Sequence, residues 1–221
     1  MLFEVGPVFK GSKPGEQSTM ISAIKTGKYS RKNWIEKERS FDVFDIKNDA
    51  LRTLSEIGFD NLKIVVSNKT KKWYHPGRSG LLSLGSTNGP ELAYFGEIHP
   101  SIIKRLDLRT DNVLGFEIFL DNIPKSRKKI RETKPQFVVS DYQKVVRDFA
   151  FVIDEKYSSG EIIALIKKID KQLIKAVKIF DVYQGDNIDT GKKSIAFSIT
   201  LEPKDKTLSE NDIEQISKKI I

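Results

Sequence analysis

A proline-bounded, strongly charged stretch near the middle of the chain limits what it can fold into. It reads Pro124-Lys125-Ser126-Arg127-Lys128-Lys129-Ile130-Arg131-Glu132-Thr133-Lys134-Pro135. A segment this charged does not pack in a hydrophobic core, and like charges extend it by repulsion. A basic linker is also able to contact RNA phosphates, but solubility and extension through self-repulsion are the commoner explanation. We therefore expect a linker over residues 124–139, one domain in residues 1–123 and a second in residues 140–221.

The first domain is predicted to be strand-rich with one good helix. Apolar residues recur every three or four positions over residues 43–57, with Ser40 or Asp42 available to cap the start and Gly58 to end the helix. Glycine, serine and proline at residues 11–15 favour a hairpin between the first two strands. The strand-like runs cover residues 2–9, 20–25, 62–66, 81–84, 92–97 and 113–119.

The second domain shows the order strand, helix, strand, strand, helix. Ser158 and Glu161 form a capping box for a helix whose apolar positions run to Leu173, and Ser209 opens a final helix. The strands are predicted at residues 149–153, 177–183 and 194–201. This is the order of a ferredoxin-like βαββα(β) fold without its last strand, which leaves one sheet edge unpaired. The whole chain is therefore expected to be α+β.

The positive charge of the chain is unevenly distributed. The formal net charge is +8, with 24 Lys and Arg against 16 Asp and Glu in residues 1–135 but 14 against 14 in residues 136–221. Since phosphate neutralisation supplies most sequence-independent affinity for nucleic acid, the second domain alone is expected to bind RNA weakly. Such binding would depend on a local patch of lysines, which are Lys167, Lys168, Lys171, Lys175 and Lys178. They are candidate phosphate contacts or, equally, the solvated face of a helix and its exit.

Composition also limits the compartment. The chain of 221 residues is 38% hydrophobic and holds no cysteine, so it can build cores but no disulfide framework or thiolate metal site. It has no long apolar run and no signal-like N-terminus. We expect a cytoplasmic protein with no membrane association.

An acid, an aromatic residue and a hydroxyl fall on neighbouring predicted strands: Asp181, Tyr183 and Ser194. A carboxylate accepts hydrogen bonds from the N1 and N2 donors of guanine, a tyrosine ring stacks on any base, and a serine hydroxyl donates or accepts at a base edge. The trio therefore indicates a reader of one unpaired base. The alternative is a solvent-facing strand with a turn acid and a half-buried tyrosine.

Six short motifs carry a resemblance that covers essentially the whole chain. They are Leu2-Phe3-Glu4-Val5-Gly6-Pro7-Val8-Phe9, His75-Pro76-Gly77-Arg78, Gly96-Glu97-Ile98-His99-Pro100, Arg147-Asp148-Phe149-Ala150, the segment from Phe180 to Ser194, and Thr207-Leu208. With these motifs in family order, the chain resembles the C-terminal part of the bacterial phenylalanyl-tRNA synthetase beta subunit.

The resemblance implies a degenerate, class II synthetase-like catalytic fold in residues 1–123, which supports the catalytic alpha subunit, and an anticodon-binding domain in residues 140–221. It implies that Asp181 and Ser194 hydrogen-bond the first anticodon base, a guanine, that Tyr183 stacks on it and that Ala150 leaves room beside it. The implied partners are tRNA(Phe) and the alpha subunit, in a heterotetramer of two alpha and two beta chains. The parent reaction uses ATP and Mg²⁺, which the alpha subunit mainly holds, so no cofactor is expected on this chain. Because the family extends beyond both ends, the sequence is expected to be a piece of a longer protein or the product of a split gene.

Catalysis is not expected from this chain by itself. A class II synthetase needs arginines for the α and γ phosphates of ATP, but the first strand has none and only Arg78 follows the third-motif remnant. His75, His99 and Glu97 can be drawn as a metal trio, but their spacing is not that of a metal motif, and histidines that tie down turns explain them as well. Two rival functions remain: an assembly module for the alpha subunit without RNA binding in isolation, and a metal or ligand enzyme built on those histidines.

Overall fold

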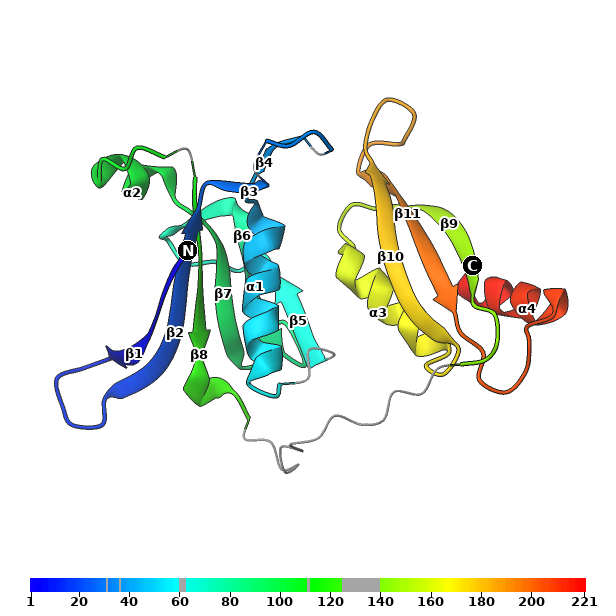
Figure 1. Cartoon of the computed structure of the whole chain (residues 1–221), viewed down its shortest axis with the longest axis horizontal. Helices are drawn as coiled ribbons and strands as arrows, with labels where there is room; N and C mark the ends of the chain where they lie inside the picture. The colour runs from blue at the N-terminus through cyan, green and yellow to red at the C-terminus, as the bar shows by residue number, and fades with distance from the viewer. Residues whose placement is uncertain (31, 36, 60–62, 111, 125–139) are drawn as a thin grey trace. The chain divides into compact units, whose positions relative to one another are not determined.

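The computed structural model describes residues 1–30, 32–35, 37–59, 63–110, 112–124 and 140–221 (Figure 1). The chain divides into two compact units, Met1–Thr133 and Lys134–Ile221. Both combine antiparallel sheets with helices, so the predicted α+β class is confirmed. From residue 125 onward, the linker predicted at 124–139 lies outside the described residues, and its extent stays a prediction.

The first unit is built on a six-stranded antiparallel sheet of order β1-β2-β8-β7-β6-β5 (Figure 1). Each of the six predicted strand runs corresponds to one of these strands. The strands β2, β6 and β7 are longer than predicted, and residue 62 of the predicted run 62–66 lies outside the described residues. Their bounds are β1 Leu2–Phe9, β2 Gln17–Thr26, β5 Ile64–Ser67, β6 Tyr74–Leu84, β7 Glu91–Ile98 and β8 Val113–Phe119.

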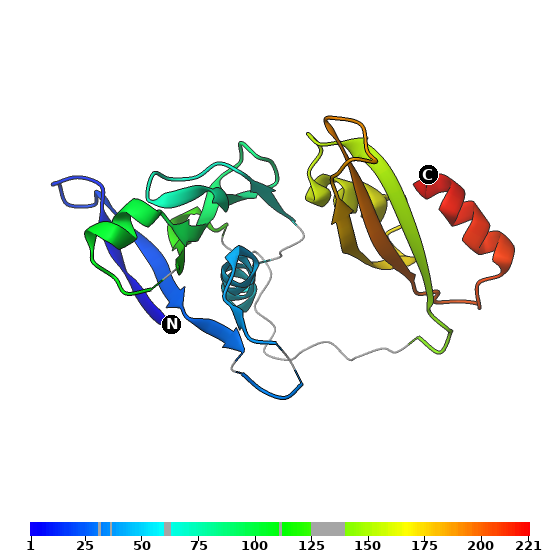
Figure 2. The same ribbon diagram turned by 90° about the horizontal axis from the view of Figure 1, so that it is seen from above.

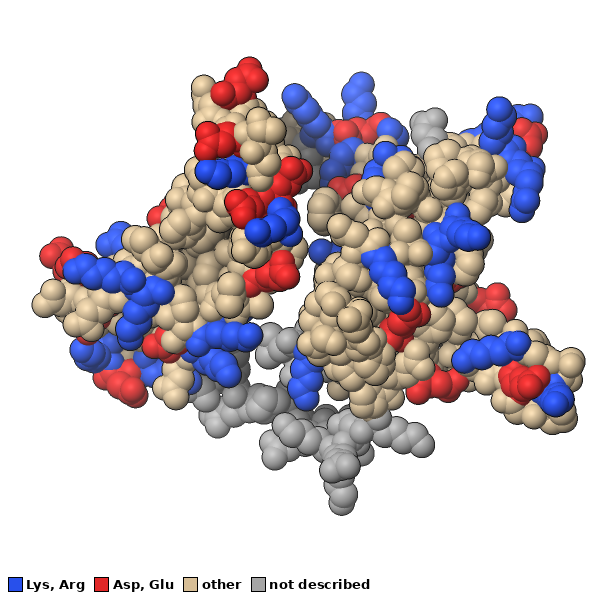
Figure 3. All heavy atoms as spheres, turned by 180° about the vertical axis from the view of Figure 1, so that it is seen from behind, with Lys and Arg blue, Asp and Glu red and all other residues tan. Residues whose placement is uncertain are grey.

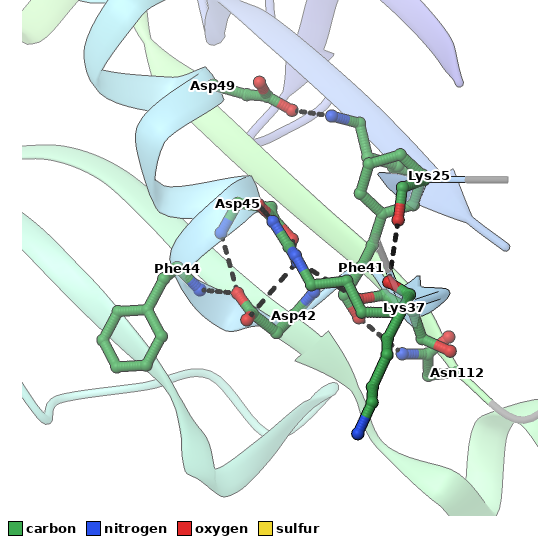
Figure 4. Close-up of polar contacts among 11 residues, drawn as sticks. Lys25, Lys37, Phe41, Asp42, Phe44, Asp45, Asp49 and Asn112 are labelled. Atoms are coloured by element: carbon green, nitrogen blue, oxygen red, sulfur yellow. Dashed lines mark hydrogen bonds and ion pairs between the residues drawn. The ribbon is translucent and has the colours of Figure 1, made fainter. Parts of the chain in front are cut away.

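The helix α1, Val43–Glu56, packs on one face of this sheet; Figure 2 shows it almost along its axis. The Asp42 side chain accepts hydrogen bonds from the backbone N–H groups of Phe44 (2.8 Å) and Asp45 (3.0 Å), so Asp42 rather than Ser40 is the N-cap (Figure 4). The helix buries three side chains completely against sheet residues; these are Ile46, Ala50 and Leu54. The predicted apolar periodicity is therefore the face that contacts the core.

The strand β1 lies at the edge of the sheet and pairs only with β2, from Leu2 opposite Ile24 to Phe9 opposite Gln17. The predicted hairpin is confirmed, with Gly15 at a φ of +88° in its loop. The strand leaves large apolar side chains in solvent: Phe3 is 76% exposed and Phe9 72%. Surface of this kind is typical of a contact with another protein.

Several short elements of the first unit were not predicted. They are β3 Lys28–Ser30, β4 Arg39–Ser40, α2 Pro100–Arg105 and the 3₁₀ turn η2 Leu120–Asn122. The β3–β4 hairpin is held by Arg39, whose guanidinium donates to both carboxylate oxygens of Asp45 (2.6 and 2.8 Å) and stacks over the ring of Tyr29. These elements depend on tertiary contacts and on chain segments too short to show a hydrophobic period.

The second unit is a three-stranded antiparallel sheet of order β10-β11-β9 with two helices (Figure 1). Side chains of both helices, Ile166 and Ile216, belong to one core cluster with alternate residues of β11. Both helices begin with the predicted capping boxes, at Ser158 and at Ser209. The bounds are β9 Val145–Asp154, α3 Ser159–Ile169, β10 Ile174–Tyr183, β11 Lys192–Leu201 and α4 Glu210–Ile220.

One boundary of the second unit was predicted wrongly. The helix α3 ends at Ile169, and Leu173 lies in the following turn because the Asp170 side chain accepts from the backbone N–H groups of Gln172 (3.0 Å) and Leu173 (2.9 Å). This arrangement breaks the helix and starts β10. Within the described residues, the outer edge of β9 has no partner strand, as expected for the βαββα order. No helix in this part of the chain is long and apolar enough to span a membrane.

Candidate nucleic-acid interface

The sheet of the second unit has one covered face and one open face. Along β11, the side chains of Ile195, Phe197, Ile199 and Leu201 are buried in the core with the helices. Strand side chains alternate between faces, so the intervening Ser194, Ala196, Ser198 and Thr200 lie on the opposite face, where no helix of the described residues packs. The candidate interface is this open face.

A bulge in β10 sets which of its residues reach the open face. Ile179 is opposite Phe197, but Asp181 is opposite Ala196, so Phe180 is an additional residue in β10. In a regular strand Phe180 would oppose Ala196 and Asp181 would turn to the covered face. The bulge instead places Asp181 and Tyr183 on the open face.

The open face is therefore arranged in rows that cross the three strands. Each row takes one residue from β10, one from β11 and one from β9. The three rows are Tyr183–Ser194–Val152, Asp181–Ala196–Ala150 and Lys178–Ser198–Asp148. Directly paired residues have Cβ atoms about 4.5–5.5 Å apart, so the four predicted base-contacting residues, from three separate strands, share one surface.

The chemistry of the first two rows suits an unpaired base. The Asp181 carboxylate is exposed at the end of a row whose other members are alanines, which leaves a shallow floor beside it. Tyr183 is 45% exposed. Its ring lies against the backbone of Gly185, where an added Cβ would collide with the phenol. A flat base can thus lie on the tyrosine ring with its edge toward the carboxylate.

The five candidate phosphate-binding lysines do not form one patch. Lys167 and Lys168 lie in the last turn of α3 and Lys171 follows it, whereas Lys178 lies on the open face of the sheet. Lys175 is 3.7 Å from Glu202. Basic and acidic side chains are interspersed on the side of each unit that Figure 3 displays. Of these five lysines, Lys178 is the one next to the two rows of predicted base-contacting residues.

Two family models together match most of the chain. The model described as ferredoxin-fold anticodon binding domain matches residues 140–221, which contain the open face. The model described as phenylalanyl tRNA synthetase beta chain CLM domain matches residues 1–120.

The chain belongs to the phenylalanyl-tRNA synthetase beta chain family.

Curated relatives support the same assignment over the whole chain. A phenylalanine–tRNA ligase beta subunit of Rhodospirillum rubrum is 42% identical over 220 residues, which are 100% of this chain and 27% of that protein. Those of Paramagnetospirillum magneticum and Rickettsia bellii are 40% and 41% identical, over 27% and 24% of their lengths. The resemblance drawn from six motifs is confirmed, and the chain spans about a quarter of the length of these relatives.

The arginine that follows the third-motif remnant of the beta chain is already engaged. The Arg78 Nη2 donates to Glu97 Oε1 (2.9 Å), and its Nε donates to the other oxygen of the same carboxylate. This contact raises the pKa of Arg78 and pairs its guanidinium with a carboxylate. The strand β1 contains no arginine.

The side chains of His75 and His99 accept hydrogen bonds from backbone N–H groups, as predicted for histidines that tie down turns. The Nδ1 of His75 accepts from the N–H of Gly77 (3.1 Å), and the Nδ1 of His99 accepts from the N–H of Ser101 (3.2 Å). His99 is the N-cap of α2, while His75 lies in an irregular part of β6 rather than in a free loop. Within the described residues, no group of three potential ligands has the geometry of a metal site.

Sequence reasoning missed three residues that shape the base-contacting surface. Phe180 forms the bulge, Ala196 lies between Asp181 and Ala150, and Gly185 accommodates the ring of Tyr183. The register of β10 against β11 determines the first two, and no local pattern encodes it. Gly185 carried a signal, because glycine often marks close approach of a side chain to backbone.

Proposed function

We propose that residues 140–221 read the first anticodon base of tRNA(Phe), and that residues 1–120 support the catalytic alpha subunit of a phenylalanine–tRNA ligase. The observation that carries the first part is the bulge at Phe180, which places Asp181 and Tyr183 on the open face in register with Ser194 and Ala196. Asp181 and Ser194 would hydrogen-bond a guanine edge and Tyr183 would stack on the base. Ala150, opposite Ala196, leaves space for it.

Local geometry rather than overall charge supplies the selectivity in this proposal. The second domain has no net charge, so long-range attraction to phosphates is weak. A guanine presents two adjacent donors to a carboxylate, whereas adenine presents an acceptor at N1. Discrimination between guanine and adenine therefore requires both oxygens of the Asp181 carboxylate to be free to accept hydrogen bonds. The Asp181 side chain is exposed.

The test titrates the 221-residue chain with anticodon stem-loops that differ only at the first anticodon base. Tyr183→Ala is expected to weaken the binding of every stem-loop by about 1–3 kcal/mol, the usual contribution of base–aromatic stacking. Asp181→Asn is expected to remove about 1–3 kcal/mol of preference for guanine. Asp186→Asn, in the exposed loop beyond β10, is the matched control and leaves both properties unchanged. An equal loss for guanine and adenine stem-loops in Asp181→Asn would rule out this role of the carboxylate.

A second candidate function, assembly on the alpha subunit without RNA binding in isolation, is supported by the exposed apolar side chains of β1. Large exposed residues such as Phe3 and Phe9 are suited to a protein interface. Phe3→Ser, a solvent-exposed site, should reduce co-purification of the alpha subunit while leaving stem-loop affinity unchanged. Stem-loop binding by the chain without the alpha subunit favours base reading, and co-purification without any stem-loop binding favours assembly alone.

Amino-acid activation is assigned to the alpha subunit, with its ATP and Mg²⁺, in the cytoplasm. This assignment is supported by the occupied Arg78 and the arginine-free β1. ATP–pyrophosphate exchange with phenylalanine tests it on the 221-residue chain. Exchange above that of a heat-inactivated sample, in a preparation free of alpha subunit, would contradict it.

A further inference from the structure

The third row of the open face, Lys178–Ser198–Asp148, continues the surface formed by the two base-contacting rows. The Ser198 hydroxyl donates to Asp148 Oδ1, and within the described residues the second carboxylate oxygen of Asp148 accepts no hydrogen bond. No ion pair of Lys178 is found within the described residues, and its side chain is exposed. An available cation and an available carboxylate oxygen thus lie at the two ends of one row, with Ser198 between them.

The open face continues past the two rows of predicted base-contacting residues, so it has room for a second nucleotide. Successive residues on one face of a strand are roughly 6.6–6.8 Å apart, and Phe180 adds one residue on β10 between Asp181 and Lys178. A second base, splayed out from the same RNA strand, would therefore lie over the third row of side chains. Its phosphate would lie at the edge of the sheet, where Lys178 is placed on the outer strand β10.

The opposite end of the open face is less suited to such a contact. Lys192 and Asp154 form the next row there. The Nζ of Lys192 is 2.7 Å from Asp189, and Asp154 is paired with Lys156 at 3.0 Å. Lys192 and Asp154 would each have to give up an existing ion pair before contacting RNA, whereas Lys178 would not.

We propose that Lys178, Ser198 and Asp148 form a subsite for the nucleotide that adjoins the first anticodon base. The proposal rests on the proposed function of the same face. Lys178 contacts the phosphate between the two nucleotides. Asp148, oriented by Ser198, accepts a hydrogen bond from the amino group of the adjoining base, which favours adenine, cytosine or guanine over uracil because uracil has no exocyclic amino group.

The experiment separates the phosphate contact from the base contact. The 221-residue chain is titrated with stem-loops that vary either the first anticodon base or the adjoining base, at several salt concentrations. Lys178→Gln is expected to lower the slope of log K against log salt by about 0.7, as for one phosphate of a single strand, whatever the bases. Lys178→Arg should keep the slope. Lys219→Gln, an exposed lysine on α4 that has no assigned RNA contact, is the matched control and should not change it.

Asp148→Asn tests the base contact. It is expected to reduce the preference for an amino-bearing adjoining base over uracil by about tenfold, within the usual range for a base-edge contact, and to leave guanine preference at the first base unchanged. Ser198→Ala should reduce the same preference by a smaller factor. Circular dichroism and thermal unfolding establish that each variant is folded.

The outcomes distinguish this subsite from the first. Loss of guanine preference in Asp181→Asn together with an unchanged adjoining-base preference in Asp148→Asn overturns the subsite and leaves the first-base function standing. An equal change of slope in Lys178→Gln and Lys219→Gln overturns the phosphate contact. A wild-type chain that binds no stem-loop, or that keeps its guanine preference in Asp181→Asn, overturns the function on which the subsite rests.

Discussion

The two units use antiparallel sheets in opposite ways. In the first unit α1 covers one face of the sheet, and an aromatic cluster closes much of the other; Tyr74, Leu81 and Tyr94 are its buried members. In the second unit the face away from the helices carries small and polar side chains from Ser194 to Thr200. A sheet face thus stays accessible to a ligand when its side chains are small, and it is closed when large aromatic side chains pack on it.

The register of β10 against β11 determines which β10 side chains lie on the open face. Changing this register is expected to have the largest effect on RNA binding. Deletion of Val182 moves Tyr183 opposite Ile195, on the covered face, so stem-loop affinity should fall by at least the stacking contribution of about 1–3 kcal/mol. Deletion of Phe180 removes the bulge but keeps Asp181 opposite Ala196, so it should retain most of the guanine preference. Stem-loop titration of the two deletions checks this, and equal loss in both would show that the bulge does not set the face.

Ring placement is expected to have the next largest effect. Gly185→Ala introduces a Cβ that collides with the phenol of Tyr183 and displaces the ring from the backbone. Affinity for every stem-loop should fall by about 1 kcal/mol, a part of the stacking contribution. Gly160→Ala, where an added Cβ meets nothing within 4 Å, is the control with unchanged binding.

Helix capping gives a matched pair of changes, one in each unit. Ser209→Ala and Asp42→Ala each remove an N-cap that accepts backbone hydrogen bonds, and each should cost about 1 kcal/mol of unfolding free energy in its own unit. Urea unfolding followed by hydrogen exchange of each unit measures this. Loss of protection in both units from either change would show that they unfold together.

The same Ser209 change has a second readout. Hydrogen bonds from the backbone and side chain of Ser209, with Lys206 nearby, lower the pKa of Asp212 from 3.8 to about 2. A lowered carboxyl pKa contributes stability above pH 3.8 that is lost as the pH falls toward 2. Ser209→Ala should therefore raise the pKa of Asp212 and reduce the stability that is lost at low pH. NMR titration of Asp212 measures the change in pKa.

The smallest expected effect concerns the closed face of the first unit. Burial raises the pKa of Glu117, whose Oε2 accepts from Trp73 Nε1 at 3.3 Å. A raised carboxyl pKa means that the folded state binds the proton more tightly, so stability falls as the pH rises above 4.5. Glu117→Gln keeps an acceptor for Trp73 and should gain stability relative to the parent chain at pH 7 but not at pH 4. Urea unfolding at the two pH values checks the sign.

Local signals in the sequence predicted much of the fold. The capping residues Asp42, Ser158 and Ser209 and the apolar spacing after them determine helices within a few residues of chain. The position of Leu173 outside α3 was missed because Asp170 competes for the backbone N–H groups after it. The β3–β4 hairpin was missed because the contact of Arg39 with Asp45 and Tyr29 joins residues that no period connects.

The candidate site was predictable in residue type but not in arrangement. Asp181, Tyr183 and Ser194 stood out because their chemistry suits a base, and the family resemblance added Ala150. Their common face depends on how β10, β11 and β9 pair, including the additional Phe180. The third row stayed hidden for the same reason, since Asp148 and Ser198 are fifty residues apart in the chain and meet only through strand register.

The uneven charge of the chain has a consequence for how RNA would approach it. Residues 1–135 hold the whole net charge of +8, and residues 136–221 hold none. Sequence-independent attraction to phosphates would thus come mainly from residues 1–135 rather than from the domain that carries the open face. It weakens steeply with salt, while short-range base contacts depend on salt far less. Capture and reading would therefore behave as separable stages, and the fraction of bound RNA that is correctly chosen should grow as ionic strength rises.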